Sequence, residues 1–331
     1  MVFPNCTDAP CMLPNDTGER RLMAWVGANI NDPEQSINCR LTKEHPTCLD
    51  SIIHQLETNR NLFTGLYAFC GYSFAKGGKL ITEPWDGKPG HSSGAEYVKM
   101  ITPMMKYCVE TGIEFHPVIN FDDPADAEAN PQLYIESFAA AAKEHGWSGW
   151  STDWELPVNC SKPAIDGCWD PIGNVVNFTR FVDLSNKIAD GLHQHGLAFT
   201  SAVQWITKPW NSKPAAELSA LLSSSTVDKW LSMDTYYFGT ARVIDALDFY
   251  MNAVKPASKV GIGMSHLSAH PSEDGFIARF HALRALDVKE VDMFFMPVNS
   301  SWLPWLRKWK NDVRGCPNSG VLSAWANPTC F

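Results

Sequence analysis

The chain has no long hydrophobic run and no basic run, and these two absences exclude whole classes of protein. No apolar stretch reaches the roughly 18 residues that a membrane-spanning helix needs, so we expect no membrane span. Acidic residues outnumber lysine and arginine by 36 to 27, which gives a net charge of −9. The sequence therefore carries no electrostatic footprint for nucleic acid or for an anionic membrane.

Several motifs that would identify a cofactor or a nucleophile are also absent. No Gly-x-Gly-x-x-Gly follows a predicted strand, which argues against a dinucleotide-binding fold. No Gly-x-Ser-x-Gly elbow precedes a helix, and no cysteines show the Cys-x-x-Cys spacing of a zinc site. We assign no metal to the histidines, each of which is more often a packed or surface residue than a ligand, and we expect no other cofactor.

The composition is that of a soluble globular protein, with 45% hydrophobic and 19% charged residues. The 331 residues suffice for one large domain, and α/β barrels commonly use this length as a single unit. Thirteen tryptophans are many for such a chain. Most tryptophans pack in cores, but a surplus often lines a groove for carbohydrate or another ligand.

Ten cysteines and five Asn-x-Ser/Thr sequons indicate an oxidising environment. We therefore expect the protein to be secreted or to reside in the lumen of the secretory pathway. The opening residues show no basic region followed by an apolar one, so we expect that a signal peptide is absent from this numbering. The predicted glycosylation sites are Asn5, Asn15, Asn159, Asn177 and Asn299.

Most of the cysteines lie close to one another in sequence, in pairs that bracket loops rich in Pro, Gly, Asn or Asp. We predict a loop-stapling disulfide within each of four such pairs. Cys70 and Cys108 remain, and they could form a fifth bridge or stay two buried thiols. The four predicted disulfides join Cys6 to Cys11, Cys39 to Cys48, Cys160 to Cys168, and Cys316 to Cys330.

From residue 21 onward, strand-like and helix-like segments alternate. Eight β-α units in succession favour a parallel sheet closed into a (β/α)8 TIM barrel, an α/β fold, with an open doubly wound sheet as the alternative. We predict an extended N-terminal segment over 1–20 and a single barrel domain over 21–331. The predicted strands span 22–30, 63–74, 113–121, 146–157, 197–205, 230–238, 260–264 and 291–298. The predicted helices span 49–59, 96–111, 131–145, 174–195, 215–222, 243–253, 273–286 and 302–312.

The fourth predicted strand is the most informative. It begins after a glycine that breaks the preceding helix, and it ends at a proline. Alternation places Asp153 and Glu155 on one face about 7 Å apart, where one carboxylate raises the pKa of the other. Such a pair can keep one carboxyl protonated as a general acid beside an ionised neighbour. A solvated strand edge is the alternative, but the flanking Trp150 and Trp154 favour burial.

In (β/α)8 barrels the chemistry takes place at the carboxyl ends of the strands. Applied to the predicted strands, this rule adds a pool of polar and aromatic candidates. The pool contains Trp25, Tyr67, Phe69, Tyr72, His116, Asn120, Asp122, Asp123, Gln204, Trp205, Met233, Asp234, Tyr236, Tyr237, Ser265, His266, Asn299 and Trp302. From it we expect substrate-binding roles for Trp25, Tyr67, Phe69, Gln204, Trp205, Met233 and Trp302.

The segment 135–157 resembles the signature region of glycoside hydrolase family 18, the chitinases and related endo-N-acetylglucosaminidases. That family's fourth strand reads Asp-Gly-x-Asp-x-Asp-x-Glu, whereas this chain reads Ser148-Gly149-Trp150-Ser151-Thr152-Asp153-Trp154-Glu155. The last two carboxylates match, and serines stand in place of the first two aspartates. Residues 256–263 look like the family's approach to its seventh strand. Residues 233–239 are similar to its sixth-strand Met-x-Tyr-Asp segment in an altered register.

The resemblance implies a retaining hydrolysis in which the 2-acetamido oxygen of the substrate is the nucleophile. Glu155 would protonate the glycosidic oxygen and later activate water. Asp153 would orient the acetamido group and stabilise the intermediate by a charge-assisted hydrogen bond. Tyr236 or Asp234 would hold the same group from the other side.

The implied substrate is β-linked N-acetylglucosamine in chitooligosaccharides or in N-glycan cores. We expect this carbohydrate to be the partner of a protein that acts as a monomer. An aromatic floor would stack on the sugar at the cleavage point. The family's usual eighth-strand Trp is not evident in residues 293–297, so the candidates for this floor are Trp302 and Trp325.

The two serines of the motif strand separate three hypotheses. Ser151 can donate a hydrogen bond but cannot carry charge, so Glu155 should keep a less elevated pKa than is usual for the family. This predicts a lower pH optimum or weaker catalysis. A second hypothesis is a lectin-like protein that has kept the cleft and lost turnover. A third is a barrel enzyme acting on sugars without an N-acetyl group, with Asp122, Asp123 or Asp234 as nucleophile.

Overall fold

The computed structural model describes ten stretches of the chain. They are residues 20–27, 48–81, 94–121, 123–153, 178–203, 215–233, 235–236, 240–265, 279–280 and 282–311. The predicted N-terminal segment lies outside them except for its last residue. In these stretches, no helix is long and apolar enough to cross a membrane.

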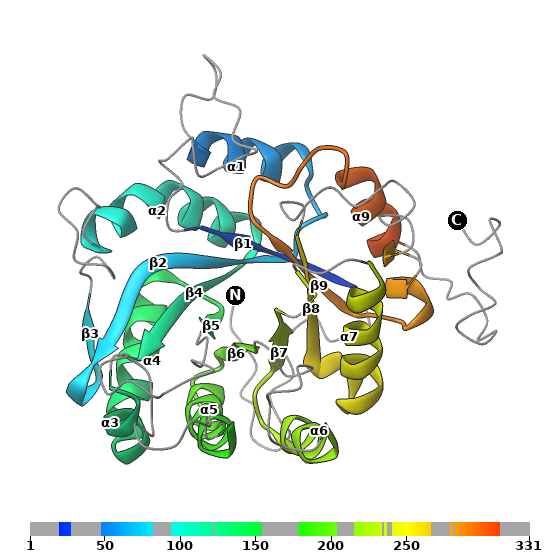
Figure 1. Cartoon of the computed structure of the whole chain (residues 1–331). Coiled ribbons are helices and arrows are strands. Elements are labelled where there is room, and N and C mark those ends of the chain that lie inside the picture. The colour runs from blue at the N-terminus through cyan, green and yellow to red at the C-terminus, as the bar shows by residue number, and fades with distance from the viewer. Residues whose placement is uncertain are drawn as a thin grey trace, which may run out of the picture.

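A ring of eight parallel strands forms the centre of the molecule (Figure 1). Around the ring the strands follow the order β1-β2-β4-β5-β6-β7-β8-β9, and the pairing of β9 with β1 closes it. The ring strands are β1 (Arg21–Val26), β2 (Gly65–Ala75), β4 (Glu114–Phe121), β5 (Gly149–Thr152), β6 (Ala198–Val203), β7 (Lys229–Ser232), β8 (Val260–Ser265) and β9 (Glu290–Phe294). The closure confirms the predicted barrel and rules out the open doubly wound sheet.

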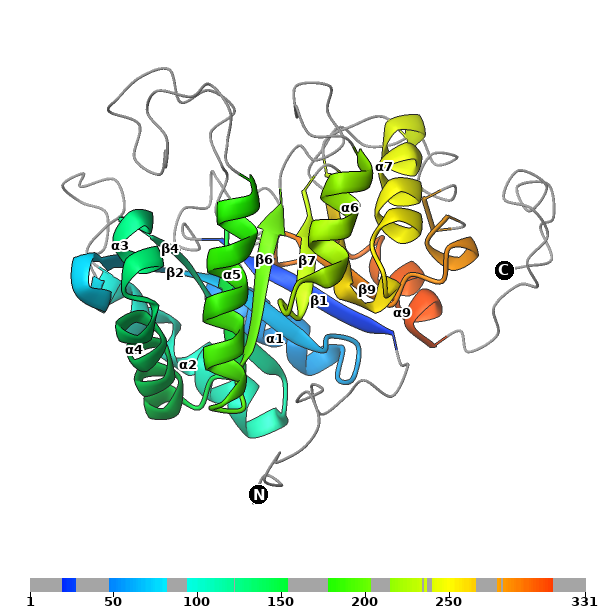
Figure 2. The same ribbon diagram turned by 90° about the horizontal axis from the view of Figure 1, so that it is seen from below.

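Helices lie around the outside of the ring and stand alongside the strands (Figure 2). They are α1 (Cys48–Thr58), α2 (Gly94–Thr111), α3 (Pro124–Ala129), α4 (Pro131–His145), α5 (Phe178–His193), α6 (Ala215–Ser224), α7 (Thr240–Ala253) and α9 (Leu303–Asn311). Residues 279–280 and 282–285, between β8 and β9, are also helical. The succession of strand and helix therefore follows the one predicted from the sequence.

The structure also contains short elements that the sequence did not predict. A bulge between Phe69 and Tyr72 interrupts the pairing of β2 with β4, and the end of β2 pairs antiparallel with β3 (Lys79–Ile81). Helix α3 is the second such element. Its N-cap is Asp123, whose carboxylate accepts a hydrogen bond from the backbone N–H of Asp126 at 3.0 Å. Asp123, a candidate nucleophile from the sequence, therefore has a structural role in the fold.

Helix α4 ends where the sequence predicted, and its end determines where β5 begins. Gly146 has a φ of +72°, the left-handed conformation that favours glycine after a helix. Its N–H and that of Trp147 both donate to the carbonyl of Ala142. Ser148 then exchanges backbone hydrogen bonds with Phe115 and Ala198 on the neighbouring strands. The motif segment is thereby aligned between β4 and β6.

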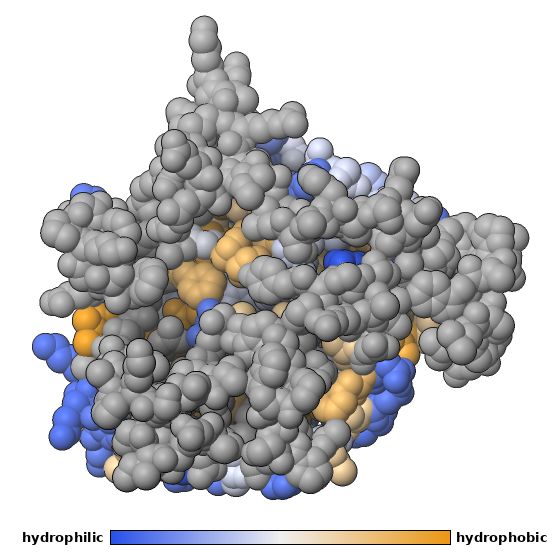
Figure 3. All heavy atoms as spheres, viewed as in Figure 1, coloured by the Kyte–Doolittle hydropathy of each residue, from blue (hydrophilic) through white to orange (hydrophobic). Residues whose placement is uncertain are grey.

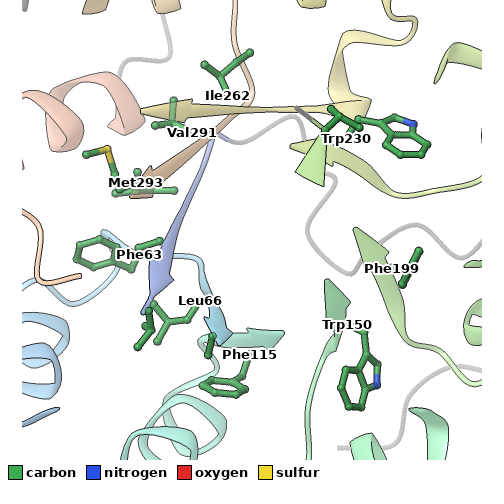
Figure 4. Packing of buried hydrophobic residues seen from close by; sticks show 14 of the residues in the cluster. Phe63, Leu66, Phe115, Trp150, Phe199, Trp230, Ile262, Val291 and Met293 are labelled. Atoms are coloured by element: carbon green, nitrogen blue, oxygen red, sulfur yellow. The ribbon is translucent and has the colours of Figure 1, made fainter. Parts of the chain in front are cut away.

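Side chains alternate between a helix-facing core and the interior of the ring. Trp150 points away from the ring, together with Phe199 and Trp230 (Figure 4). The indole of Trp150 donates to the carbonyl of Phe138 on α4 at 3.0 Å. Ser151, the next residue, is fully buried and pairs in register with Val118, whose side chain belongs to the separate cluster inside the ring. The alternation predicted for the motif strand is confirmed for these two residues.

Two cysteines are described by their side-chain state. Cys48, at the start of α1, is disulfide-bonded. Its predicted partner, Cys39, lies outside the described residues, so this pairing stays a prediction. Cys108 on α2 is a free, buried thiol. Of the two alternatives left open for Cys108, the structure therefore shows the buried thiol, and burial raises its pKa to about 12.

Candidate active site

Asp153 directly follows β5 and therefore lies at the carboxyl end of the fourth ring strand. Two residues earlier, Ser151 pairs in register with Val118 on β4 and with Thr200 on β6. Ser151 and Thr200 are both buried in the interior, and the hydroxyls of both have no hydrogen-bond partner among the described residues. Asp153 is half-buried. The strand thus places one carboxylate at the rim of the barrel, above a neutral polar layer.

The interior of the ring near this rim is filled by an apolar group that we call the interior cluster. Five residues proposed from the sequence meet in it or pack against it, namely Trp25, Tyr67, Phe69, Met233 and Tyr236. The full cluster consists of Met23, Trp25, Tyr67, Val118, Ala202, Leu231, Met233 and Tyr236, with Phe69, Phe294 and Phe295 packed against it. In the view of Figure 1, apolar surface is visible near the centre of the molecule (Figure 3).

Aromatic rings connect the strands within the interior cluster. The ring of Trp25 lies 5.0 Å from that of Tyr67 and 5.5 Å from that of Phe69, centroid to centroid. Phe69 meets Phe295 edge to face at 6.3 Å. The indole N–H of Trp25 has no acceptor among the described residues, although the side chain is only 1% exposed. Rings from β1, β2 and the end of β9 therefore form a continuous aromatic cluster inside the ring.

Tyr236 reaches the interior cluster because β8 has no side chain in its way. A Cβ on Gly263 would overlap the ring of Tyr236, and the tyrosine ring stacks on Phe294 with centroids 4.9 Å apart. The neighbouring Thr235 hydroxyl lies 2.8 Å from that of Ser232 and donates to the carbonyl of Gly263. Thr235 is thus engaged by the backbone, and Tyr236 is the residue of this segment that packs inward.

Trp302 is not brought together with the others. It is 5% exposed, belongs to the helix-facing core, and packs edge to face on Phe280 at 6.0 Å. Its backbone N–H donates to the carbonyl of Asn299, in the turn that leads into α9. The structure therefore does not support Trp302 as an aromatic floor under a sugar.

Several proposed residues lie outside the described part of the chain. They include Glu155, the proposed acid, and Asp234, together with Gln204, Trp205, Asp122, Tyr237, His266 and Trp325. The same holds for four of the predicted glycosylation sites, Asn5, Asn15, Asn159 and Asn177, and for Cys6, Cys11, Cys39, Cys160, Cys168, Cys316 and Cys330. Asn299 is described and is half-buried. The roles of all these residues remain predictions.

Two aromatic residues at the rim were missed by the sequence reasoning. Phe294 ends β9 and Phe295 follows it, and the two rings pack against the interior cluster with centroids 3.5 Å apart. The strand-end rule that selected the other candidates would also have selected this pair. Phenylalanines, and not the tryptophan expected from the family resemblance, stand at the end of the eighth ring strand.

Deeper in the ring lies a group of charged residues that we call the basal ion cluster: Arg21, Glu114, Lys229, Glu290 and Asp292. Arg21 donates two hydrogen bonds to Glu114, both at 2.8 Å, and one to Glu290 at 2.7 Å. Lys229 lies 3.6 Å from the Glu290 carboxylate. No group of three or more His, Cys, Asp or Glu side chains in the described stretches is arranged to hold a metal ion.

The pKa values in the basal ion cluster diverge. Burial works against the charged form of Glu114, but hydrogen bonds from His116 and Arg21 outweigh it and hold the pKa below its ordinary value. Burial is likewise outweighed at Glu290 by Lys229 and Arg21, so its pKa is also lowered. Burial and the nearby Glu290 raise the pKa of Asp292 well above its ordinary value. The pKa of Asp292 is therefore shifted in the opposite direction from those of Glu114 and Glu290.

The sequence matches no family model and no curated protein. Solved structures, however, share the fold along most of the chain. A class V chitinase from Pseudomonas fluorescens Pf-5 aligns with a TM-score of 0.59 at 12% identity, over 88% of this chain and 99% of that one. A chitinase from Chromobacterium violaceum gives 0.57 at 10%, over 88% and 98%.

A third likeness is to a GH18 chitinase from Pseudoalteromonas aurantia, with a TM-score of 0.52 at 11% identity. It covers 87% of this chain and 97% of that one. At these identities the likeness concerns the fold, and this chain has the barrel architecture of those chitinases.

Proposed function

We propose that this chain is a glycoside hydrolase of the family 18 type that cleaves β-linked N-acetylglucosamine in chitooligosaccharides or N-glycans. One observation carries the proposal. Asp153 stands at the carboxyl end of the fourth strand of a barrel whose solved likenesses include chitinases. In this proposal Asp153 orients the 2-acetamido group of the substrate, which attacks the anomeric carbon. Glu155, two residues further along the chain, donates a proton to the leaving oxygen and then activates water.

The interior cluster supports a sugar substrate. Carbohydrate rings present apolar faces that stack on aromatic side chains, and the half-buried Phe69 and Phe295 meet edge to face near Asp153's end of the barrel, with the buried Trp25 packed against Phe69. Phe295 takes the place of Trp302 as the floor under the sugar.

The decisive experiment compares the parent chain with Glu155→Gln and Asp153→Asn on chitooligosaccharides and high-mannose glycopeptides. Loss of hydrolysis in both variants, with sugar binding retained, supports the proposal. Glu144→Gln is a matched control, because Glu144 is exposed on α4. Activity in the parent only on sugars that lack an N-acetyl group would point instead to the third hypothesis, a different barrel chemistry.

A second candidate function is carbohydrate binding without turnover, and Ser151 favours it. This serine is fully buried inside the barrel and cannot share a proton with Asp153 as a carboxyl group could. Ser148 is likewise uncharged and accepts a 3.4 Å hydrogen bond from the backbone of Phe115. Binding of chitooligosaccharides with no detectable hydrolysis by the parent would establish this candidate over the enzyme.

The same serine gives the proposed enzyme a signature in pH. With one negative neighbour fewer, Glu155 should have a lower pKa in the complex than a full set of carboxylates would give, so we expect an acidic optimum. Ser151→Asp should then shift the pH optimum upward. Full turnover of the parent at neutral pH, unchanged in Ser151→Asp, would contradict this part of the proposal.

Secretion belongs to the same proposal. Five sequons and ten cysteines, of which Cys48 is disulfide-bonded, fit a protein that matures in an oxidising compartment. Expression in a secretory host should give a product whose mass falls on treatment with a glycosidase that removes N-glycans. An unglycosylated product with reduced cysteines would argue against it.

A further inference from the structure

Asp292 is a buried carboxyl that the proposed chemistry does not use. It lies on β9, two residues after Glu290, so both side chains point into the ring. Its exposure is 0%, and neither carboxyl oxygen has a hydrogen-bond partner among the described residues. A buried carboxylate with no donor is costly, because an ion loses its hydration without compensation.

The donors near Asp292 are directed at the other two carboxylates. Arg21 places all its carboxylate contacts on Glu114 and Glu290. Tyr67 donates to Glu290 at 3.1 Å, and Lys229 contacts Glu290 and donates to the carbonyl of Ser258. Two cations thus face two paired carboxylates. A third negative charge would have no counter-charge.

The groups packed around Asp292 provide no hydrogen-bond donor for its carboxyl oxygens among the described residues. On β8 its neighbours are glycines, and a Cβ at Gly261 would overlap an oxygen of Asp292 and crowd Glu290 and Leu231. The titratable groups that interact electrostatically with it are Glu290 on its own strand, Arg21 on β1, Tyr67 on β2 and Lys229 on β7, while on β4 Glu114 interacts with Arg21 and with His116. Because Glu290 crowds the same glycine, ionised Asp292 would place a like charge beside an ionised carboxylate.

We propose that Asp292 is held as a neutral carboxylic acid in the folded protein, and that its ionisation at rising pH loosens the base of the barrel. The basal ion cluster then acts as a built-in alkaline switch. Burial and the charge of Glu290 both raise the pKa of this carboxyl, in agreement with the geometry.

The sign of the effect follows from proton linkage. In the unfolded chain an aspartate ionises near its ordinary pKa of about 3.9, whereas Asp292 keeps its proton in the folded state. Its contribution to stability is therefore full below about pH 4 and is lost as pH rises toward the raised folded pKa. Asparagine has the shape of the neutral acid and never ionises. Asp292→Asn should thus match the parent at acid pH and exceed it at neutral pH.

The test is thermal unfolding of the full chain and Asp292→Asn between pH 4 and pH 8. We expect Tm to be equal at pH 4 and the variant to be several degrees higher at pH 7, with the gap growing with pH. Asp183→Asn, at an exposed position on α5, is the control and should show no such trend. A variant less stable than the parent at pH 7 would mean that Asp292 is ionised and paired, and would overturn the proposal.

Infrared spectroscopy provides a second measurement that does not depend on how the variant folds. A protonated carboxyl has a carbonyl stretching band that a carboxylate lacks. The parent should show this band at pH 7 and lose it as pH rises through the raised pKa of folded Asp292. If the band is absent from the folded parent at pH 7, the proposal is wrong.

Discussion

The hydroxyl of Tyr67 donates a 3.1 Å hydrogen bond to the buried carboxylate of Glu290, while its ring packs 5.0 Å from the ring of Trp25. One side chain therefore joins the basal ion cluster to the interior cluster. Tyr67 is fully buried, and its polar end is directed toward the base of the barrel and away from the rim. Tyr67 was expected to bind the substrate directly. Its contacts indicate instead that it positions the ring of Trp25.

Tyr67→Phe should separate that support from direct substrate binding. The variant keeps the ring under Trp25 and removes one donor from Glu290, which retains Arg21. We expect the free energy of unfolding to fall by about 1–3 kcal/mol, the range for a hydrogen bond to a charged group. We expect KM for chitooligosaccharides to change less than twofold. Denaturant unfolding and steady-state kinetics measure the two effects, and a large rise in KM at unchanged stability would mean that the hydroxyl contacts the sugar.

Arg21 is the side chain on which the basal ion cluster depends most. It is 6% exposed and pairs with two carboxylates, Glu290 on the adjacent strand β9 and Glu114 on β4, which lies beyond β2. Arg21→Met would leave Glu114 with only His116 and Glu290 with only Lys229 and Tyr67, and we expect a loss of about 3–5 kcal/mol of unfolding free energy. Arg21→Lys keeps the charge but not the two-pronged contact, so it should fall between parent and Met variant. Equal stability of all three proteins would show that the ion pairs add nothing to the fold.

A second pH effect lies near the end of α5, where His193 Nε2 is 2.9 Å from the carboxylate of Asp228. The hydrogen bond to Asp228 raises the pKa of His193 above its ordinary value. The stability that this pair contributes is therefore complete below the unfolded pKa of about 6.5 and is lost as pH rises through the folded value. In His193→Gln, Tm should depend less on pH between 6 and 8. An NMR titration of His193 at or below its ordinary pKa would contradict this.

The barrel could be predicted from the sequence because it rests on local patterns. Helix α4 matched its prediction over 131–145, since an amphipathic face and Gly146 define it within a few residues. The basal ion cluster could not be predicted in this way. Arg21 and Glu290 are 269 positions apart, and each resembles an ordinary surface charge in its own segment. Only the closing of the ring between β1 and β9 brings them together.

The errors at the rim have a similar cause. The rule that functional residues follow the strand ends selects positions in the sequence. It does not say in which direction each side chain points. Trp302 fits the rule in sequence, but its ring turns outward to Phe280, whereas Phe294 and Phe295 meet the interior cluster. The packing of Tyr236 against Gly263, which has no side chain, also could not be predicted from the sequence. It depends on the register between β7 and β8.

Gly263→Ala tests that fit. An added methyl group would overlap the ring of Tyr236, which is fully buried against Phe294 and has little room to move. We expect a loss of about 1–3 kcal/mol in unfolding free energy from overpacking, and a loss of activity if Tyr236 holds the acetamido group. Gly27→Ala is the stability control, because its added Cβ would lie 3.5 Å from Phe295, an ordinary contact. If Gly263→Ala is as stable and active as the parent, neither stability nor activity depends on the present position of Tyr236.

Phe295→Ala and Trp302→Ala should have opposite signatures. Phe295 is half-buried beside Phe69, so removing its ring should weaken stacking on the sugar and raise KM about tenfold, which corresponds to about 1.4 kcal/mol of binding. Trp302 is 5% exposed in the helix-facing core, so its removal should cost about 3–5 kcal/mol of unfolding free energy and leave KM near the parent value. Steady-state kinetics and denaturant unfolding of both variants show which of the two residues contacts the sugar and which one only packs in the core. If only Trp302→Ala raises KM, and its stability is unaffected, Trp302 would be the floor of the site after all. A residue that acts only through packing should not change KM while stability stays the same.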